Sequence, residues 1–287
     1  MSSRAKTLLV TDLDNTLWDW FEAWHASFDA MLQVLVKQSG VPRDTLEQEI
    51  RSIHQMRRTT EYSYLLNEVP SLITAAGSQE PMVAYDDALH ALNRVRKERT
   101  RLYPGVEETL TQLKKRGFRV VAYTESVAYW TEWRIKHTGL DGLIDVLYSA
   151  PDHDLPAGVD ISDLRTRNAD EYGLKKTVHK ATPNGAIKPN PEILKAILAA
   201  EKTDADQTVY VGDSLMKDIH MAQQVGVTDV HAKYGEAQGR TDYSLLQRVT
   251  HWTDEDVARE QALRTNDELV ATHVLGTSFD DILDILM

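Results

Sequence analysis

The chain has 287 residues, which is enough for about two domains of ordinary size or one domain with a large insertion. Hydrophobic residues make up 42% of the chain and charged residues 26%, a composition typical of a folded globular protein rather than a disordered one. The absence of cysteine excludes disulfides, thiolate metal sites and a cysteine nucleophile. The net charge of −12 argues against nucleic acid as a partner, since non-specific binding to nucleic acid needs a basic surface.

The hydropathy of the chain gives no sign of membrane insertion or export. No apolar run reaches the roughly 18 residues of a membrane-spanning helix, so the sequence predicts no membrane partner. Residues 1–6 lead into a short apolar segment without the hydrophobic stretch and cleavage site of a secretory signal. We therefore expect a cytoplasmic protein, and the sequence leaves its oligomeric state open.

The first third of the chain combines one strand with a long helical segment. Residues 6–10 form a short β-rich run that ends in a polar loop, which predicts a buried strand. Apolar residues then recur at helical spacing from Leu17 to Leu35, and the helix is expected to end near Gly40. The pattern remains helical to Arg101. We therefore predict a separate helical domain over residues 18–101.

Strands and helices alternate in the rest of the chain. The predicted strands cover residues 118–123, 143–148, 207–211, 227–230 and 272–275. The predicted helices cover residues 106–116, about 127–137, 191–200, 215–224, about 254–263 and 279–286. Residues 124–126 are expected to form a loop, and residues 150–187 a long, loop-rich excursion. Such alternation predicts an α/β fold, with a Rossmann-like parallel sheet core made by residues 1–17 and 102–287.

Polar side chains follow three of the predicted strands, and a lysine precedes one of the helices. These candidates are Asp12, Asp14, Thr124, Lys188, Asp213 and Asp218. We expect them to meet, because ligands of an open α/β sheet bind beyond the carboxyl ends of its strands. Crowded carboxylates repel one another unless a cation lies between them, and an all-oxygen ligand set favours Mg²⁺. A metal, a lysine and a hydroxyl together stabilise charge on a transferring phosphoryl group, and a carboxylate is a competent nucleophile there.

These residues resemble, in the same order along the chain, the four motifs of the haloacid dehalogenase (HAD) superfamily. The matching segments are Asp12-Leu13-Asp14-Asn15-Thr16, Thr124, Lys188-Pro189 and Gly212-Asp213-Ser214-Leu215-Met216-Lys217-Asp218. The first motif alone is a weak signal, whereas four ordered motifs at strand ends are a strong one. The resemblance covers roughly residues 5–17 and 102–235. It implies that the helical segment 18–101 is the cap that many relatives insert after the first motif.

The resemblance also implies a role for each matched catalytic residue. Asp12 would be the nucleophile that attacks phosphorus. Asp14 would protonate the leaving alcohol and then activate water. Thr124 would hydrogen-bond the phosphoryl group, and Lys188 would neutralise the charge of Asp12 and of the phosphoryl group.

The cofactor implied by the resemblance is Mg²⁺. The metal would be held by the side chain of Asp12, the main-chain carbonyl of Asp14 and the side chain of Asp213. Asp218 would orient the metal shell or Lys188, and it completes the predicted metal set.

The function implied is a Mg²⁺-dependent phosphatase that acts on a small phosphomonoester through an aspartyl-phosphate. Asp14 favours this class, because dehalogenases of this fold lack the second aspartate of the motif. A capped site favours a small phosphorylated metabolite as the partner. Two alternatives remain open: a phosphomutase of the same superfamily, and a non-catalytic metabolite-binding or regulatory protein on this fold. The sequence does not name the substrate.

One residue departs from the family pattern. Glu125 follows Thr124 at a position where many relatives have Asn, and its place puts it in the predicted phosphate-binding set with Thr124 and Lys188. A carboxylate there either repels a phosphate or is turned away from it.

Overall fold

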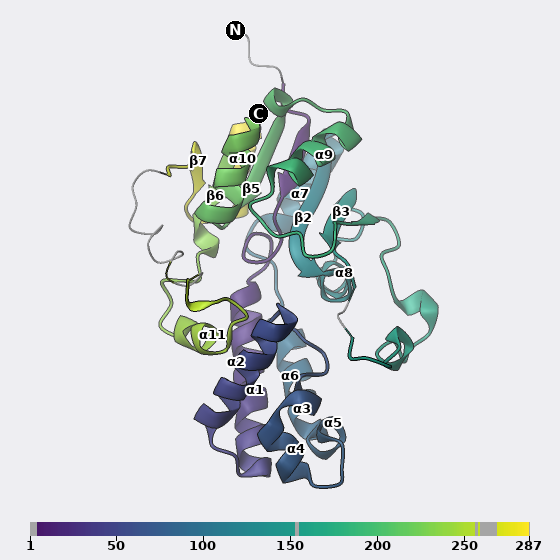
Figure 1. Ribbon diagram of the computed structural model, residues 1–287. Helices are drawn as coiled ribbons and strands as arrows, with labels where there is room; N and C mark the ends of the chain where they lie inside the picture. The colour runs from purple at the N-terminus through teal and green to yellow at the C-terminus, as the bar shows by residue number, and fades with distance from the viewer. Residues whose placement is uncertain (1–4, 153–154, 256–257, 259–268, 287) are drawn as a thin grey trace.

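The computed structural model describes residues 5–152, 155–255, 258 and 269–286. Its centre is a seven-stranded sheet in which every paired strand is parallel, in the order β4-β3-β2-β1-β5-β6-β7 (Figure 1). The strands are β1 (Leu8–Thr11), β2 (Arg119–Val127), β3 (Val146–Ala150), β4 (Val178–Ala181), β5 (Thr208–Gly212), β6 (Thr228–Ala232) and β7 (His273–Leu275). The predicted α/β fold with a Rossmann-like sheet and a helical cap is confirmed.

Side chains of the central strands alternate between two faces of the sheet, and each face has its own apolar core. Leu9 and Val120 belong to one core, whereas Leu8, Val10 and Val121 belong to the other. The helices α7 (Val106–Lys115), α8 (Ala128–His137) and α13 (Leu283–Leu286) contribute to the first core, and α9 (Pro191–Glu201) and α10 (His220–Val225) to the second. The near-continuous apolar sequence of β1 follows from this, because both faces of the strand are buried.

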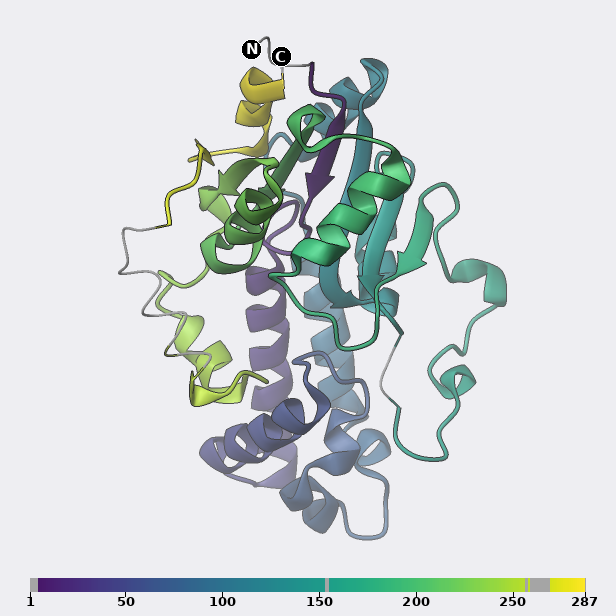
Figure 2. The ribbon, with the colours of Figure 1, turned by 45° about the horizontal axis from the view of Figure 1, so that its top comes forward.

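The cap forms a separate helical body at the carboxyl-terminal edge of the sheet (Figures 1 and 2). Its helices are α1 (Trp20–Ser39), α2 (Arg43–Arg57), α3 (Leu65–Glu68), α4 (Pro70–Ala76), α5 (Pro81–Ala84) and α6 (Asp86–Arg99). The carboxylate of Asp19 accepts a hydrogen bond from the amide of Glu22 and caps α1, and Gly40 ends that helix at a φ of 71°. Two adjacent segments join the cap to the sheet, where Trp18 pairs with Leu102.

A segment beyond the sheet core also packs on the cap. Helix α11 (Tyr243–Val249) lies beside α1 and α2 in both ribbon views (Figures 1 and 2). Tyr243, Leu245 and Val249 are buried in the same apolar cluster as the cap helices. Part of the C-terminal region, which we predicted to belong to the sheet domain, therefore contributes to the hydrophobic core of the cap.

The structure corrects two local predictions. Strand β4 lies inside the predicted excursion 150–187; it is an edge strand of four residues whose Val178 is 53% exposed, so it lacks the buried apolar pattern of an inner strand. Residues 124–126 are not a loop: β2 continues to Val127, which pairs with Ala150 after an irregularity in register. The helix predicted at about 254–263 lies largely outside the described residues. Among those residues, no helix combines the length and apolar character needed to cross a membrane.

Candidate active site

Asp12 lies at the carboxyl end of the central strand β1, where its amide donates to the carbonyl of Val211 at 2.8 Å. The side chain is buried, and its two oxygens have different partners. Lys188 Nζ donates to Oδ1 at 2.5 Å, and the hydroxyl of Thr16 donates to Oδ2 at 3.2 Å. The strand and both side chains thus hold the Asp12 carboxylate in one orientation.

Lys188 joins Asp12 to a second carboxylate. Its Nζ also donates to Oδ1 of Asp218 at 2.9 Å, and it lies over the ring of Tyr123 at 4.9 Å from the centroid. The side chain is only 2% exposed. Burial acts to lower the pKa of Lys188, but the carboxylates of Asp12 and Asp218 outweigh burial and hold this pKa well above its ordinary value. Lys188 is therefore a permanently charged group at the centre of the site.

Asp218 is fixed by the turn that follows β5. It lies in a π-helical turn, Leu215–Ile219, and its Oδ2 accepts a hydrogen bond from the amide of Ser214 at 3.2 Å. The hydroxyl of Tyr210 donates to Oδ1 at 2.8 Å. A Cβ on Gly212 would collide with the Asp218 side chain, so the glycine permits this close approach.

Three carboxylates gather at this edge of the sheet. Asp12, Asp213 and Asp218 each offer an oxygen, and these oxygens lie within 4.8 Å of one another. Burial raises the pKa of Asp12 to about 7, with the charges of Asp218 and Asp14 adding to the effect and Lys188 opposing it. Burial, followed by repulsion from Asp12, also raises the pKa of Asp213 well above its ordinary value. Asp12 and Asp218 are buried and Asp213 is half-buried, and such crowded, mutually repelling oxygen donors fit a divalent cation such as Mg²⁺.

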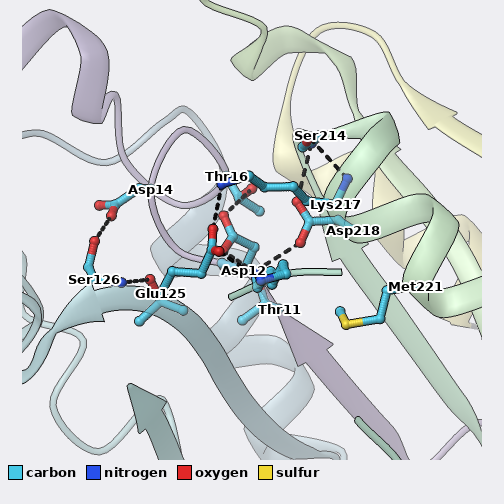
Figure 3. Close-up of polar contacts among 12 residues, drawn as sticks. Thr11, Asp12, Asp14, Thr16, Glu125, Ser126, Ser214, Lys217, Asp218 and Met221 are labelled. Carbon is cyan, nitrogen blue, oxygen red and sulfur yellow. Dashed lines mark hydrogen bonds and ion pairs between the residues drawn. The ribbon is translucent and has the colours of Figure 1, made fainter. Parts of the chain in front are cut away.

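The side chain of Asp14 points away from this cluster toward Ser126 near the end of β2 (Figure 3). The indole Nε1 of Trp18 donates to its Oδ1 at 2.6 Å, and the hydroxyl of Ser126 donates to its Oδ2. The guanidinium of Arg134, from α8, lies 3.7 Å from Oδ1. The structure therefore does not bring the Asp14 carboxylate into the metal cluster, and the predicted contribution of Asp14 to the metal is that of its main chain.

The end of β2 explains the unusual glutamate. Thr124 is buried, and its hydroxyl accepts a hydrogen bond from the amide of Ser126 at 3.1 Å. Glu125 accepts from the amide of Lys188 at 2.7 Å and from Nζ of Lys217 at 2.6 Å (Figure 3). Burial acts to raise the pKa of Glu125, but Lys217 and Lys188 outweigh burial and lower it. Glu125 is thus charged and paired with Lys217; its contact with a phosphate stays a prediction.

Sequence reasoning missed several members of this network. Ser126 and Lys217 lie within or beside the recognised motifs, so their positions in the sequence could have identified them. Nothing in the sequence distinguishes Arg134, because it is one of several basic residues near the end of a helix. Only the fold places it beside Asp14.

Relatives with known names share this chain's sequence over differing lengths. The glyceraldehyde 3-phosphate phosphatase of Methanopyrus kandleri is 24% identical over 242 residues, which cover 80% of this chain and 85% of the relative. The protein of the same name from Pyrococcus abyssi is 44% identical, but over only 52 residues, which span 22% of its own length.

Solved structures share the fold. The 2-haloacid dehalogenase from Pseudomonas syringae pv. Tomato DC3000 matches with a TM-score of 0.57 and 22% identity, over 98% of both chains. The HAD phosphatase from Thermococcus onnurineus matches with a TM-score of 0.53 and 18% identity, over 97% of both chains. The model of the haloacid dehalogenase-like hydrolase family matches residues 6–226. That range is well over half of the chain and contains all the residues of the site, so this chain belongs to the haloacid dehalogenase-like hydrolases.

Proposed function

We propose that the chain is a Mg²⁺-dependent phosphatase that hydrolyses a small phosphomonoester through an aspartyl-phosphate on Asp12. The observation that carries the proposal is the buried triad in which Lys188 bridges Asp12 and Asp218 at 2.5 and 2.9 Å. This triad holds the carboxylate of Asp12 beside the fixed positive charge of Lys188. That charge offsets the repulsion between an anionic phosphoryl group and the nucleophilic carboxylate that it must approach.

In the first proposed step an oxygen of Asp12 bonds to phosphorus while the bond from phosphorus to the ester oxygen breaks. Asp14 donates a proton to that oxygen, so the product leaves as a neutral alcohol. In the second step Asp14 takes a proton from a water molecule, whose oxygen bonds to phosphorus as the Asp12–phosphorus bond breaks. Lys188 and Thr124 balance and orient the phosphoryl oxygens in both steps. Mg²⁺ held by the side chains of Asp12, Asp213 and Asp218 and by the main chain of Asp14 would supply further positive charge for those oxygens.

The substrate class is a small phosphorylated metabolite. Residues 18–101 are proposed as a cap domain that covers the site and excludes bulk water. The named relatives are glyceraldehyde 3-phosphate phosphatases, so this triose phosphate belongs in the first set of compounds to be tested.

The test measures phosphate release from p-nitrophenyl phosphate, glyceraldehyde 3-phosphate and other metabolite phosphates, with Mg²⁺ and with EDTA. Release should require the metal, and Asp12→Asn should lower it by about six orders of magnitude, as expected when a nucleophile is removed. Asp284→Asn removes an exposed carboxylate from α13 and serves as the matched control. Near-normal release by Asp12→Asn would refute the assignment of the nucleophile. Isomer formation in place of phosphate release would identify a mutase.

A further inference from the structure

A cavity lies between the cap and α8. It has a volume of about 180 Å³, and its lining residues come mainly from the cap, with two aromatic residues of α8 and one leucine of the 150–187 excursion. Most of the wall is aliphatic or aromatic, including Phe28, Leu66 and Trp130. An apolar pocket with a few polar groups is the usual form of a small-molecule site.

Arg96 of α6 brings a positive charge into this wall, although it is only 8% exposed. Its guanidinium lies 4.1 Å from the centroid of the Trp130 ring, but its Nη1 is buried without a hydrogen-bond partner. Among the described residues, no carboxylate lies within ion-pairing distance of it. Burial lowers the pKa of Arg96 to about 10, and the charge of Glu61 only partly opposes this effect. A buried cation without a counterion is unfavourable, so the binding of an anion beside Arg96 should be favourable.

The nearby acid is already used by another arginine. Glu61 lines the same cavity and accepts a hydrogen bond from Nη2 of Arg134. Arg134 also lies beside Asp14, the proposed acid for the leaving group. Arg134 therefore connects Glu61 in the cavity wall to Asp14 in the candidate active site. Arg96 is the cation that this pairing leaves without a carboxylate.

We propose that this cavity binds the non-reacting end of the substrate, and that this end is a carboxylate on a short apolar carbon chain. The inference rests on the proposed phosphatase function and names its substrate class. Arg96 would hold the carboxylate through charge-assisted hydrogen bonds, and the apolar wall would contact the carbon chain. Glyceraldehyde 3-phosphate carries an aldehyde and a hydroxyl in that place and would leave Arg96 without a counterion.

The test uses a series of phosphate esters of ω-hydroxy carboxylic acids with increasing numbers of methylene groups, each paired with its primary amide. The two members of a pair match in size and differ in one negative charge. For the best chain length, wild-type kcat/KM should favour the acid over the amide by about 10- to 100-fold, the usual effect of a charged hydrogen bond. Arg96→Gln should bring this ratio close to one. Arg94→Gln removes an exposed charge from the same helix and should preserve the ratio.

The outcomes separate this proposal from the one on which it rests. Hydrolysis of acids and amides at equal rates by the wild type would overturn the role of Arg96 and leave the phosphatase intact. An unchanged ratio in folded Arg96→Gln would do the same. If that variant does not fold, the wild-type ratio decides, together with Arg96→Lys, which keeps the charge and should retain part of the preference. Absence of hydrolysis of every ester, p-nitrophenyl phosphate included, would overturn both proposals.

Discussion

A buried histidine in the cap should make the stability of the protein depend on pH. His54 of α2 is completely buried, and its Nδ1–H donates to the carbonyl of Val249 at the end of α11 at 2.6 Å. Its Nε2 is buried without a partner. Burial lowers the pKa of His54 to about 4, and the hydrogen bond to Val249 opposes this only in part. The folded protein therefore holds this ring in its neutral form.

The magnitude follows from the two pKa values of the ring. In the unfolded chain His54 binds a proton below about pH 6.5, whereas the folded protein binds it only below about pH 4. Between these values the unfolded state holds more protons, so the free energy of unfolding falls as the pH falls. The full difference corresponds to about 3 kcal/mol, of which about 2 kcal/mol is lost between pH 7 and pH 5.

The assay is urea unfolding of the wild type and of His54→Gln across this pH range. The variant has no proton to gain at this position, so the stability difference between the two proteins should shrink by about 2 kcal/mol from pH 7 to pH 5. The exposed His90 of α6 provides the control, and His90→Gln should not reproduce that change. Parallel curves for the wild type and His54→Gln would contradict this prediction, because they would mean that the ring titrates alike in the folded and unfolded states.

Three further predictions concern the active site. Asp213→Asn removes one of the three clustered carboxylates and should raise the Mg²⁺ concentration for half-maximal phosphate release by about 10-fold or more. Lys188→Met leaves Asp12 and Asp218 without their shared cation; without metal it should lower the free energy of unfolding by about 3–5 kcal/mol, and Mg²⁺ should restore part of this loss in a thermal melt. Since the pKa of Asp12 is raised to about 7, protons compete with the metal, so Mg²⁺ affinity measured by calorimetry should strengthen as the pH rises from about 6 to 8.

The inner strands and their order of appearance were predictable, because burial on both faces leaves a plain apolar run such as that of β1. Strand β4 was not predictable, because its Val178 is exposed at the sheet edge and nothing in its sequence pattern distinguishes it from a loop.

The packing of α11 on the cap could not be predicted for another reason. Its buried Tyr243 and Val249 meet residues some 200 positions away, and such contacts leave no local periodicity.

The convergence of the candidate site residues was predictable from order and spacing, since parallel strands bring their carboxyl ends to one edge. The contact between Lys188, Asp12 and Asp218 agrees with that expectation. The pairing of Glu125 with Lys217 could not be deduced, because it depends on how the π-helical turn after β5 orients Lys217 toward β2. The charge of Glu125, which the sequence suggested would repel a phosphate, is thus balanced by Lys217 from another motif.

In the proposed mechanism the phosphoryl group passes through Asp12. The most direct test is to mix the enzyme with excess phosphomonoester and Mg²⁺, quench in acid within one turnover, and map phosphorylated peptides by mass spectrometry. One acid-stable, base-labile phosphoryl group is expected on the peptide that contains Asp12, and none in Asp12→Asn. Phosphate release without any phosphorylated peptide, or a phosphoryl group on another residue, would contradict it.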